Sequence, residues 1–242
     1  MNNAAAPEAR PSAERATFDA YAAAYDDALG RGLILTGEGK EYFAAGRVAH
    51  IRAVLQTLGV TPKRVMDYGC GTGSTTPLLR EAWNVSSLVG VDPSPESIRV
   101  ARSQQRSNAV RFERVQEYVP AGDRDLVYSN GVFHHIPPNE RPKALAYIAG
   151  ALASGGIFAF CENNPWNPGT RYVMSRIPFD RDAVTLSPPE ARRILRGEGF
   201  EIVRTDSLFV FPRPLSWLRS LESALVRVPV GGQYIVFCRR SA

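Results

Sequence analysis

Three glycines at alternate positions interrupt the chain directly after a short apolar run, and no other stretch constrains the fold as strongly. The run at residues 65–66 leads into Asp67, and the glycines are Gly69, Gly71 and Gly73. A buried strand that ends in glycines and opens into a helix brings bare backbone close to a ligand, because glycine has no Cβ. The helix start adds N–H groups that have no partner within the helix. The stretch therefore predicts a strand–loop–helix unit that holds a nucleotide-like ligand.

Asp67 lies two residues before the first glycine, and its charge selects among nucleotide-like ligands. A dinucleotide-binding loop reads G-x-G-x-x-G and rests a pyrophosphate on the helix N-terminus, whereas the spacing here is G-x-G-x-G. A carboxylate at this position repels a pyrophosphate but suits a ligand that carries positive charge. S-adenosylmethionine (SAM), with its sulfonium and ammonium groups, is such a ligand. An ordinary glycine turn between a strand and a helix stays as the alternative.

The D-x-G-x-G-x-G pattern of residues 67–73 resembles the first motif of class I SAM-dependent methyltransferases. The resemblance has specific motifs over residues 41–162 and rests on the order of elements beyond them. It implies an α/β fold: a Rossmann-like, seven-stranded, mostly parallel sheet with helices on both faces and an N-terminal helical lid. One strand of the family's sheet inserts antiparallel, and the late strands expected at 201–210 and 234–239 fit that pattern.

Polar residues close the predicted strands, and parallel strands bring their carboxyl ends to one edge of the sheet. The first part of the cofactor site comprises Asp67, Tyr68, Gly69, Gly71, Thr72 and Gly73. Asp92 and Pro93 follow at the interval where an acid reaches a ribose in related nucleotide sites, since two carboxylate oxygens accept from both hydroxyls. Capping of the helix that begins near Ser94 is the alternative role for Asp92.

Three further segments complete the cofactor site as the resemblance implies it. Gln116 follows a strand expected at 110–115, where family members often carry an acid or an amide that meets the adenine amino group. The strand expected at 125–130 contributes Ser129 and Asn130, and Val132 follows it. Arg47, on a helix expected at 41–58, could meet the SAM carboxylate. An arginine on a solvated helix face is the alternative.

Two adjacent histidines, His134 and His135, lie in a turn that also resembles the family. Methyl transfer from a sulfonium is an in-line displacement by an activated donor, so the protein mainly aligns acceptor, methyl and sulfur. A hydroxyl or amine acceptor also loses a proton, and imidazole titrates near neutral pH. The candidate catalytic residues are His134, His135 and Glu162. We expect one histidine to face the acceptor and the other to support the turn; a structural role for both is the alternative.

One domain is expected, because no break in composition divides the 242 residues. The expected parts are a flexible tail at 1–13 and a methyltransferase domain at 14–242, with a helical lid at 14–60, a SAM-binding core at 61–162, an irregular insertion at 163–187 and a C-terminal half at 188–242. Within the last part, an apolar helical stripe at 212–229 either packs on the domain or touches a membrane surface or a lipid-like substrate.

Composition narrows the classes of partner. The net charge of +5 is not concentrated in a run of Lys or Arg, so a nucleic-acid partner is unsupported. The three cysteines lack paired metal spacing, so no metal site is expected, and reduced core thiols are consistent with the cytoplasm. The first dozen residues lack the apolar segment of a signal peptide, and no apolar run approaches the ~20 residues of a membrane helix.

Together these features favour a SAM-dependent methyltransferase that acts on a small-molecule acceptor at oxygen or nitrogen. An amphipathic or lipid-linked acceptor is one form of this hypothesis, and the oligomeric state stays open. Two alternatives from other classes remain: a catalytically silent SAM-binding regulatory protein and an NAD-dependent oxidoreductase.

Overall fold

The computed structural model describes residues 33, 36–105, 107–178, 180 and 183–240. The tail expected at 1–13, and the part of the helical lid expected at 14–32, lie outside the described residues. The helix expected at 41–58 is present as α3 (Lys40–Thr57).

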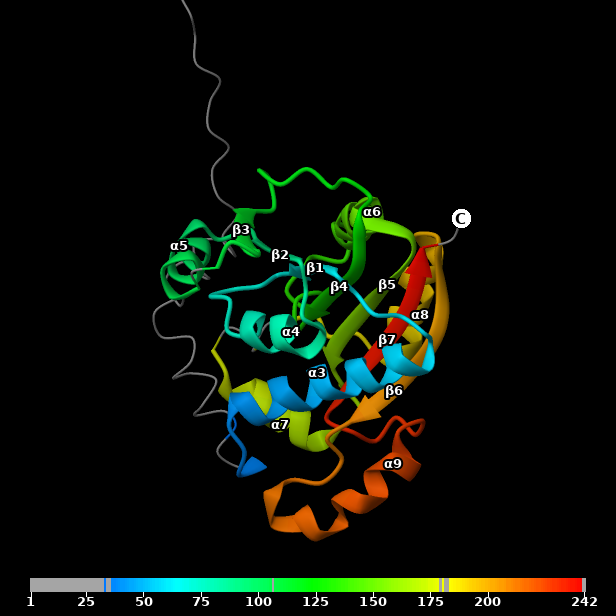
Figure 1. Ribbon diagram of the computed structural model, residues 1–242. Coiled ribbons are helices and arrows are strands. Elements are labelled where there is room, and N and C mark those ends of the chain that lie inside the picture. The colour runs from blue at the N-terminus through cyan, green and yellow to red at the C-terminus, as the bar shows by residue number, and fades with distance from the viewer. Residues whose placement is uncertain (1–32, 34–35, 106, 179, 181–182, 241–242) are drawn as a thin grey trace, which may run out of the picture.

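A seven-stranded sheet forms the centre of the domain, in the order β3-β2-β1-β4-β5-β7-β6 (Figure 1). Its strands are β1 (Arg64–Tyr68), β2 (Ser87–Asp92), β3 (Val110–Arg114), β4 (Arg124–Asn130), β5 (Leu152–Asn163), β6 (Phe200–Leu208) and β7 (Gln233–Arg240). The pairs from β3 to β5 are parallel, whereas β7 is antiparallel to both β5 and β6. The mostly parallel sheet and its antiparallel insertion are thereby confirmed.

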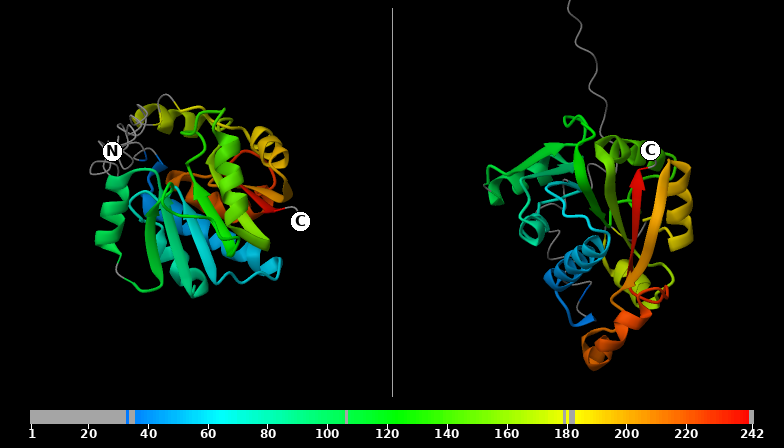
Figure 2. Two further views of the ribbon diagram at one scale, coloured as in Figure 1. Left: turned by 90° about the horizontal axis from the view of Figure 1, so that it is seen from above. Right: turned by 45° about the vertical axis from the view of Figure 1, so that its right-hand side comes forward.

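Helices cover both faces of the sheet, as expected (Figures 1 and 2). Besides α3, they include α4 (Thr76–Trp83), α5 (Pro95–Gln104), α6 (Arg141–Ala151), α7 (Pro168–Arg176) and α8 (Pro188–Gly197). Successive strand residues point to opposite faces. Val65 therefore packs in the cluster that α3 and α4 cover, and its neighbour Met66 packs in the cluster that α6 and α8 cover.

The parallel arrangement places the ends of β1, β2, β4 and β5 at one edge of the sheet. These ends carry Asp67, Asp92, Asn130 and Glu162, in register with their neighbours across the sheet. Ligands of open α/β sheets bind at this edge. This edge of the sheet therefore carries the polar groups suited to a binding site.

The segment expected as an irregular insertion at 163–187 contains a regular helix, so that prediction was wrong in part. Helix α7 begins with Pro168, and the side chain of Asn167 accepts a hydrogen bond from the Thr170 N–H at 3.0 Å. Proline is favoured in the first helical position because its missing N–H has no partner there in any helix. The Asn-Pro pair is thus a helix start and not part of a loop.

The apolar stripe at 212–229 forms a 3₁₀ helix, η2 (Arg213–Leu221), and one turn of α-helix, α9 (Glu222–Leu225). Neither contains a buried residue, and Trp217 is 74% exposed. The stripe therefore does not enter the core of the domain (Figure 2). None of the helices in the described ranges is long and apolar enough to cross a lipid bilayer.

Candidate functional site

The glycines after β1 serve different purposes. All three have positive φ, at +75° for Gly69, +52° for Gly71 and +78° for Gly73. Residues that carry a side chain rarely adopt such a backbone conformation. A Cβ on Gly69 would lie 2.3 Å from Cγ2 of Val132, so this close approach is made by the protein itself. A Cβ on Gly71 would have no described atom within 4 Å. Gly71 is therefore the glycine beside open space.

Asp92 ties the glycine loop to the next helix. Its side chain accepts hydrogen bonds from the N–H of Gly71 at 2.9 Å and from that of Ser94 at 2.9 Å. Ser94 in turn caps α5 by accepting from the Ser97 N–H. Asp92 thus supports the helix start, the alternative role considered for it. Each carboxylate oxygen can accept a further hydrogen bond, so this role does not exclude ribose binding.

Asp67 is the next-to-last residue of β1, lies near Asp92 and is 3% exposed. Burial and the neighbouring charge of Asp92 raise the pKa of Asp67 to about 7, against the opposing effect of Arg47. Burial disfavours an ionised carboxylate, and a second carboxylate nearby adds to that cost. A cationic ligand at this edge would relieve both effects.

Arg47 extends from α3 toward the same edge, and it is buried, so the solvated-face interpretation is wrong. Its Nε donates to the hydroxyl of Tyr128 at 3.1 Å, and its Nη1 donates to Oε1 of Gln233 at 2.8 Å. Both partners are neutral. A buried guanidinium held by neutral groups keeps its charge available for an anion.

The remaining residues of the expected cofactor site occupy varied environments. The Tyr68 ring packs in the core, 6.3 Å from the ring of Phe133 and 5.7 Å from that of Tyr147 between centroids. Gln116 is exposed in the turn after β3, and Pro93 is exposed after β2. Thr72 is half-buried in the glycine loop. Of these side chains, that of Tyr68 is part of the hydrophobic core.

Two polar atoms at the end of β4 lack partners. Oγ of Ser129 and Oδ1 of Asn130 are buried, and neither has a hydrogen-bond partner among the described residues. Buried polar atoms are normally paired, and an exception calls for a ligand or a water molecule. Val132, two residues later, packs over Gly69 as described above.

Glu162 positions His134. The Nδ1 of His134 lies 2.6 Å from Oε2 of Glu162, and Oε1 of Glu162 accepts from the Phe133 N–H at 2.7 Å. Glu162 is 2% exposed, and both of its oxygens are engaged. The carboxylate therefore orients the imidazole from behind and does not itself face open space.

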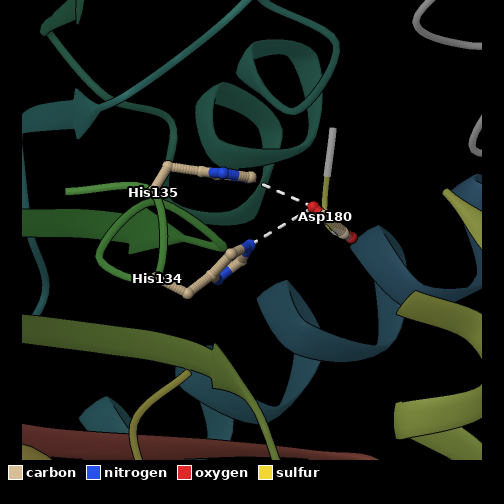
Figure 3. Close-up of side chains that lie close together, drawn as sticks. All are labelled: His134, His135 and Asp180. Carbon is tan, nitrogen blue, oxygen red and sulfur yellow. Dashed lines mark ion pairs between the residues drawn. The ribbon is translucent and has the colours of Figure 1, made fainter. Parts of the chain in front are cut away.

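Asp180 faces both histidines from the far side (Figure 3). Its Oδ1 lies 3.4 Å from Nε2 of His134 and 3.2 Å from Nε2 of His135. Burial by itself would lower the pKa of His134, but Glu162 and Asp180 raise that pKa to about 10. Burial by itself would raise the pKa of Asp180, but its contacts with the two histidines outweigh burial and lower that pKa. The two histidines do not divide their roles as expected, since both face Asp180.

Sequence reasoning did not identify Asp180. It lies in the segment interpreted as an irregular insertion, and no residue pattern around it indicates a partner. The only signal was the expectation that this segment covers the active face. One donor atom from each of His134, His135 and Asp180 lies within 4.8 Å of the others, so the group could hold a metal ion.

A pocket of about 400 Å³ opens beside this cluster, between α3 and α7. The histidines, Asp180, Asn130 and Arg47 line one part of it. Another part of the lining is an aromatic wall, with Tyr42, Phe43, Phe209 and Phe211. The wall is packed: the Phe43 and Phe209 ring centroids are 4.9 Å apart, and Arg219 stacks 4.7 Å from the Tyr42 centroid. The pocket thus combines an apolar wall with a charged end, as small-molecule sites do.

Residues 41–205 match the methyltransferase domain family. The trans-aconitate 2-methyltransferase of Mycobacterium sp. (strain KMS) is 28% identical over 166 residues, 62% of this chain and 62% of that protein. The trans-aconitate 2-methyltransferase of Rhodopseudomonas palustris (strain BisB18) is 34% identical over 118 residues, 49% of this chain and 45% of that protein. The chain therefore spans less than two thirds of the length of these relatives.

Solved structures agree in fold. A SAM-dependent methyltransferase of Thermotoga maritima has a TM-score of 0.65 and 17% identity, covering 94% of this chain and all of the other. A complex of DhpI with SAH has a TM-score of 0.61 and 18% identity, covering 94% of this chain and 95% of the other. The identities are low, so these structures establish the fold alone. The family match covers more than half of the chain, and the protein belongs to the methyltransferase domain family.

Proposed function

We propose that this protein is an enzyme that transfers the methyl group of SAM to an oxygen or nitrogen atom of a small-molecule acceptor. One observation carries the proposal: Asp67, next to last in β1, and Asp92, last in the neighbouring strand β2, lie close to Gly71, where the backbone borders open space. Two buried carboxylates in one site favour a cationic ligand, because a positive charge offsets the cost of burying them. SAM carries a sulfonium and an ammonium group. Membership of the methyltransferase domain family supports the same ligand.

The residues around the glycine loop fit the parts of SAM. Asp92 would accept from the ribose hydroxyls, and Asp67 would face the cationic methionine portion. Arg47, buried between neutral partners, would pair with the SAM carboxylate. Gln116, exposed after β3, would reach the adenine amino group, and the unpaired oxygen of Asn130 would accept from the ligand.

The pocket between α3 and α7 would hold the acceptor, because it adjoins Arg47 and Asn130 at the same edge of the sheet. In the transfer, the acceptor atom attacks the methyl carbon, the carbon–sulfur bond breaks and sulfur keeps the electron pair. A hydroxyl or amine acceptor also loses its proton. His134 and His135 lie where that atom would sit, and Glu162 acts as a positioning residue through His134.

Titration calorimetry with SAM and with its demethylated product tests the binding step. Methyl-labelled SAM and a cell extract then test transfer, with trans-aconitate as the first pure acceptor because two relatives are named for it. Binding without transfer to any acceptor would favour a silent SAM-binding regulatory protein. Thermal stabilisation by NAD and not by SAM would favour an oxidoreductase and overturn the proposal.

Two further features support finer parts of the proposal. All three cysteines are buried and form no disulfide, which supports a reducing compartment such as the cytoplasm. The exposed apolar residues of η2, Leu215, Trp217 and Leu221, support an acceptor with an amphipathic or lipid-linked part.

A further inference from the structure

We propose that His134, His135 and Asp180 bind a divalent transition-metal ion at the charged end of the pocket, with one coordination position open toward the acceptor. Two imidazoles and one carboxylate are donors that zinc and related ions take in catalytic sites. The three side chains converge from two segments far apart in the sequence (Figure 3).

The two distances from Asp180 to the histidines are close to those between ligands of a shared ion. Oδ1 of Asp180 lies 3.4 Å from Nε2 of His134 and 3.2 Å from Nε2 of His135. Donors that share a tetrahedral ion at bond lengths of about 2.0–2.1 Å are separated by about 3.3–3.4 Å. A charge-assisted hydrogen bond is shorter, at about 2.7–2.9 Å. The other nitrogen of His134 makes such a short contact, 2.6 Å from Glu162.

Glu162 gives His134 the form that a metal ligand needs. With Nδ1–H donated to the Glu162 carboxylate, the nitrogen left to bind an ion is Nε2, which lies 3.4 Å from Oδ1 of Asp180 and gives up its proton when the ion binds. A histidine that ligates a metal usually donates its other N–H to a carboxylate or a carbonyl, which fixes the ring. Glu162 is itself held by the Phe133 N–H at 2.7 Å, so the ring is fixed by two successive contacts.

The cluster is enclosed on one side and open on the other. The side chains of His134 and Asp180 are 3% and 7% exposed, whereas that of His135 is 17% exposed. All three line the pocket of about 400 Å³. Three protein ligands and a free position toward a pocket are the arrangement of a catalytic metal site, whereas structural sites are closed by four ligands.

The open position indicates the acceptor class, and this step rests on the proposed function. An acceptor that places a hydroxyl oxygen on the ion has the pKa of that hydroxyl lowered, because the ion stabilises the alkoxide. The proton then leaves to solvent from the coordinated oxygen, and the histidines serve as ligands in place of a base. The structure thus favours an oxygen acceptor.

The test is calorimetric titration of the chelator-treated full chain with Zn²⁺, and with Co²⁺ as a probe whose visible spectrum reports coordination by nitrogen and oxygen. We expect one ion per chain. His135→Ala and Asp180→Asn each remove one ligand and should weaken Zn²⁺ affinity at least about 10-fold. Glu162→Gln removes the charge behind His134 and should weaken it about 10-fold to 100-fold.

His50→Gln is the matched control. His50 is the one histidine of the chain outside the cluster, and it also contacts a carboxylate. It should bind Zn²⁺ as the wild type does. Absence of Zn²⁺ binding by the wild type would overturn the proposal, and so would equal affinity in the wild type, His135→Ala and Asp180→Asn. Thermal stabilisation by Zn²⁺ in the wild type, lost in Asp180→Asn, checks the same conclusion if His135→Ala folds poorly.

SAM binding, measured on the same samples, separates this inference from the proposed function. SAM binding without Zn²⁺ binding would overturn the metal site and leave methyl transfer in place. Zn²⁺ binding without SAM binding would overturn the proposed methyltransferase activity and leave the metal site in place.

Discussion

The molecule contains two clusters of histidine and carboxylate, and they balance their charges differently. In the first, Asp206 on β6 lies 2.7 Å from Nε2 of His50 and 2.8 Å from Nη2 of Arg204. Arg227 approaches the same carboxylate at 3.5 Å. Asp206 is 1% exposed, and its pKa is lowered because these partners outweigh the effect of burial. Arginines that cannot lose their charge neutralise this cluster.

The second cluster has two carboxylates, Glu162 and Asp180, against two histidines. Arg141 lies near enough to interact with Glu162, but its N–H groups donate to the carbonyls of Phe133, Ile136 and Val184. The positive charge beside Asp180 therefore comes from protons on imidazole or from a bound ion. The first cluster is thus neutralised by permanent charges, whereas the charge balance of the second depends on imidazole protons or on the ion proposed above.

The largest expected effect is on stability, and it contrasts Asp206 with Asp180. Asp206→Asn leaves Arg204 and His50 without their buried carboxylate, so we expect the free energy of unfolding to fall by about 3 kcal/mol. Asp180→Asn should lower it by less than about 1 kcal/mol, because no arginine is left unpaired. Urea unfolding of both variants measures this. Equal losses would remove the distinction between the clusters.

The second prediction concerns turnover. His135→Ala should lower the rate of methyl transfer about 100-fold at saturating SAM, since the acceptor's proton is no longer removed efficiently. SAM affinity should not change, because His135 lies on the acceptor side of the site. His50→Gln, assayed below its unfolding temperature, should keep a normal rate. If His135→Ala turned over normally, the second cluster would be structural like the first.

The third prediction extends the comparison to Asp92, whose carboxylate accepts hydrogen bonds from the backbone N–H groups of Gly71 and Ser94. Asp92→Ala should weaken SAM binding by about 1–3 kcal/mol through the loss of a charged hydrogen-bond acceptor. Ser94→Ala is the control for damage to α5, because it removes the helix cap and leaves the carboxylate in place. Calorimetry that found the same affinity in Asp92→Ala and wild type would exclude Asp92 from the site.

The smallest effect is a pH dependence of SAM binding. The pKa of Asp67 is raised to about 7 in the ligand-free chain, and the cationic ligand favours the ionised form. Affinity should therefore rise with pH from about 5 to about 7, by at most about 10-fold per pH unit, and then level off. The α-amino group of SAM keeps its charge over this window. Asp67→Asn should abolish the rise, and a rise that persisted in that variant would assign it to another group.

The same pKa shift affects the stability of the ligand-free chain with a definite sign. The folded state holds the Asp67 proton more tightly than the unfolded state, whose carboxyl titrates near pH 4. The contribution of Asp67 to stability is therefore full below about pH 4 and is lost as the pH rises to about 7. Asp206 acts in the opposite direction, because its lowered pKa contributes stability at neutral pH that is lost on acidification.

The local residue pattern was sufficient to predict the sheet and the glycine loop. A short continuous apolar run marks a buried strand, and glycines mark the turn that follows it, so β1, the loop and the carboxylates near the strand ends were predictable. The parallel order then places Asp67, Asp92 and Glu162 at one edge, because strands that run in the same direction end on the same side of the sheet. The start of α7 was also encoded locally, in Asn167-Pro168, but we interpreted that signal as a loop.

The sequence by itself determined which chemical groups lie at the edge of the sheet, because that depends on periodicity within single elements. Only the tertiary structure decided what those groups face. Arg47 meets Gln233 across 186 positions, and Asp180 meets His134 and His135 from a segment with no pattern of its own. Such contacts depend on how separate elements pack, and burial then sets their charges, since the cost of an ion depends on the solvent that packing removes.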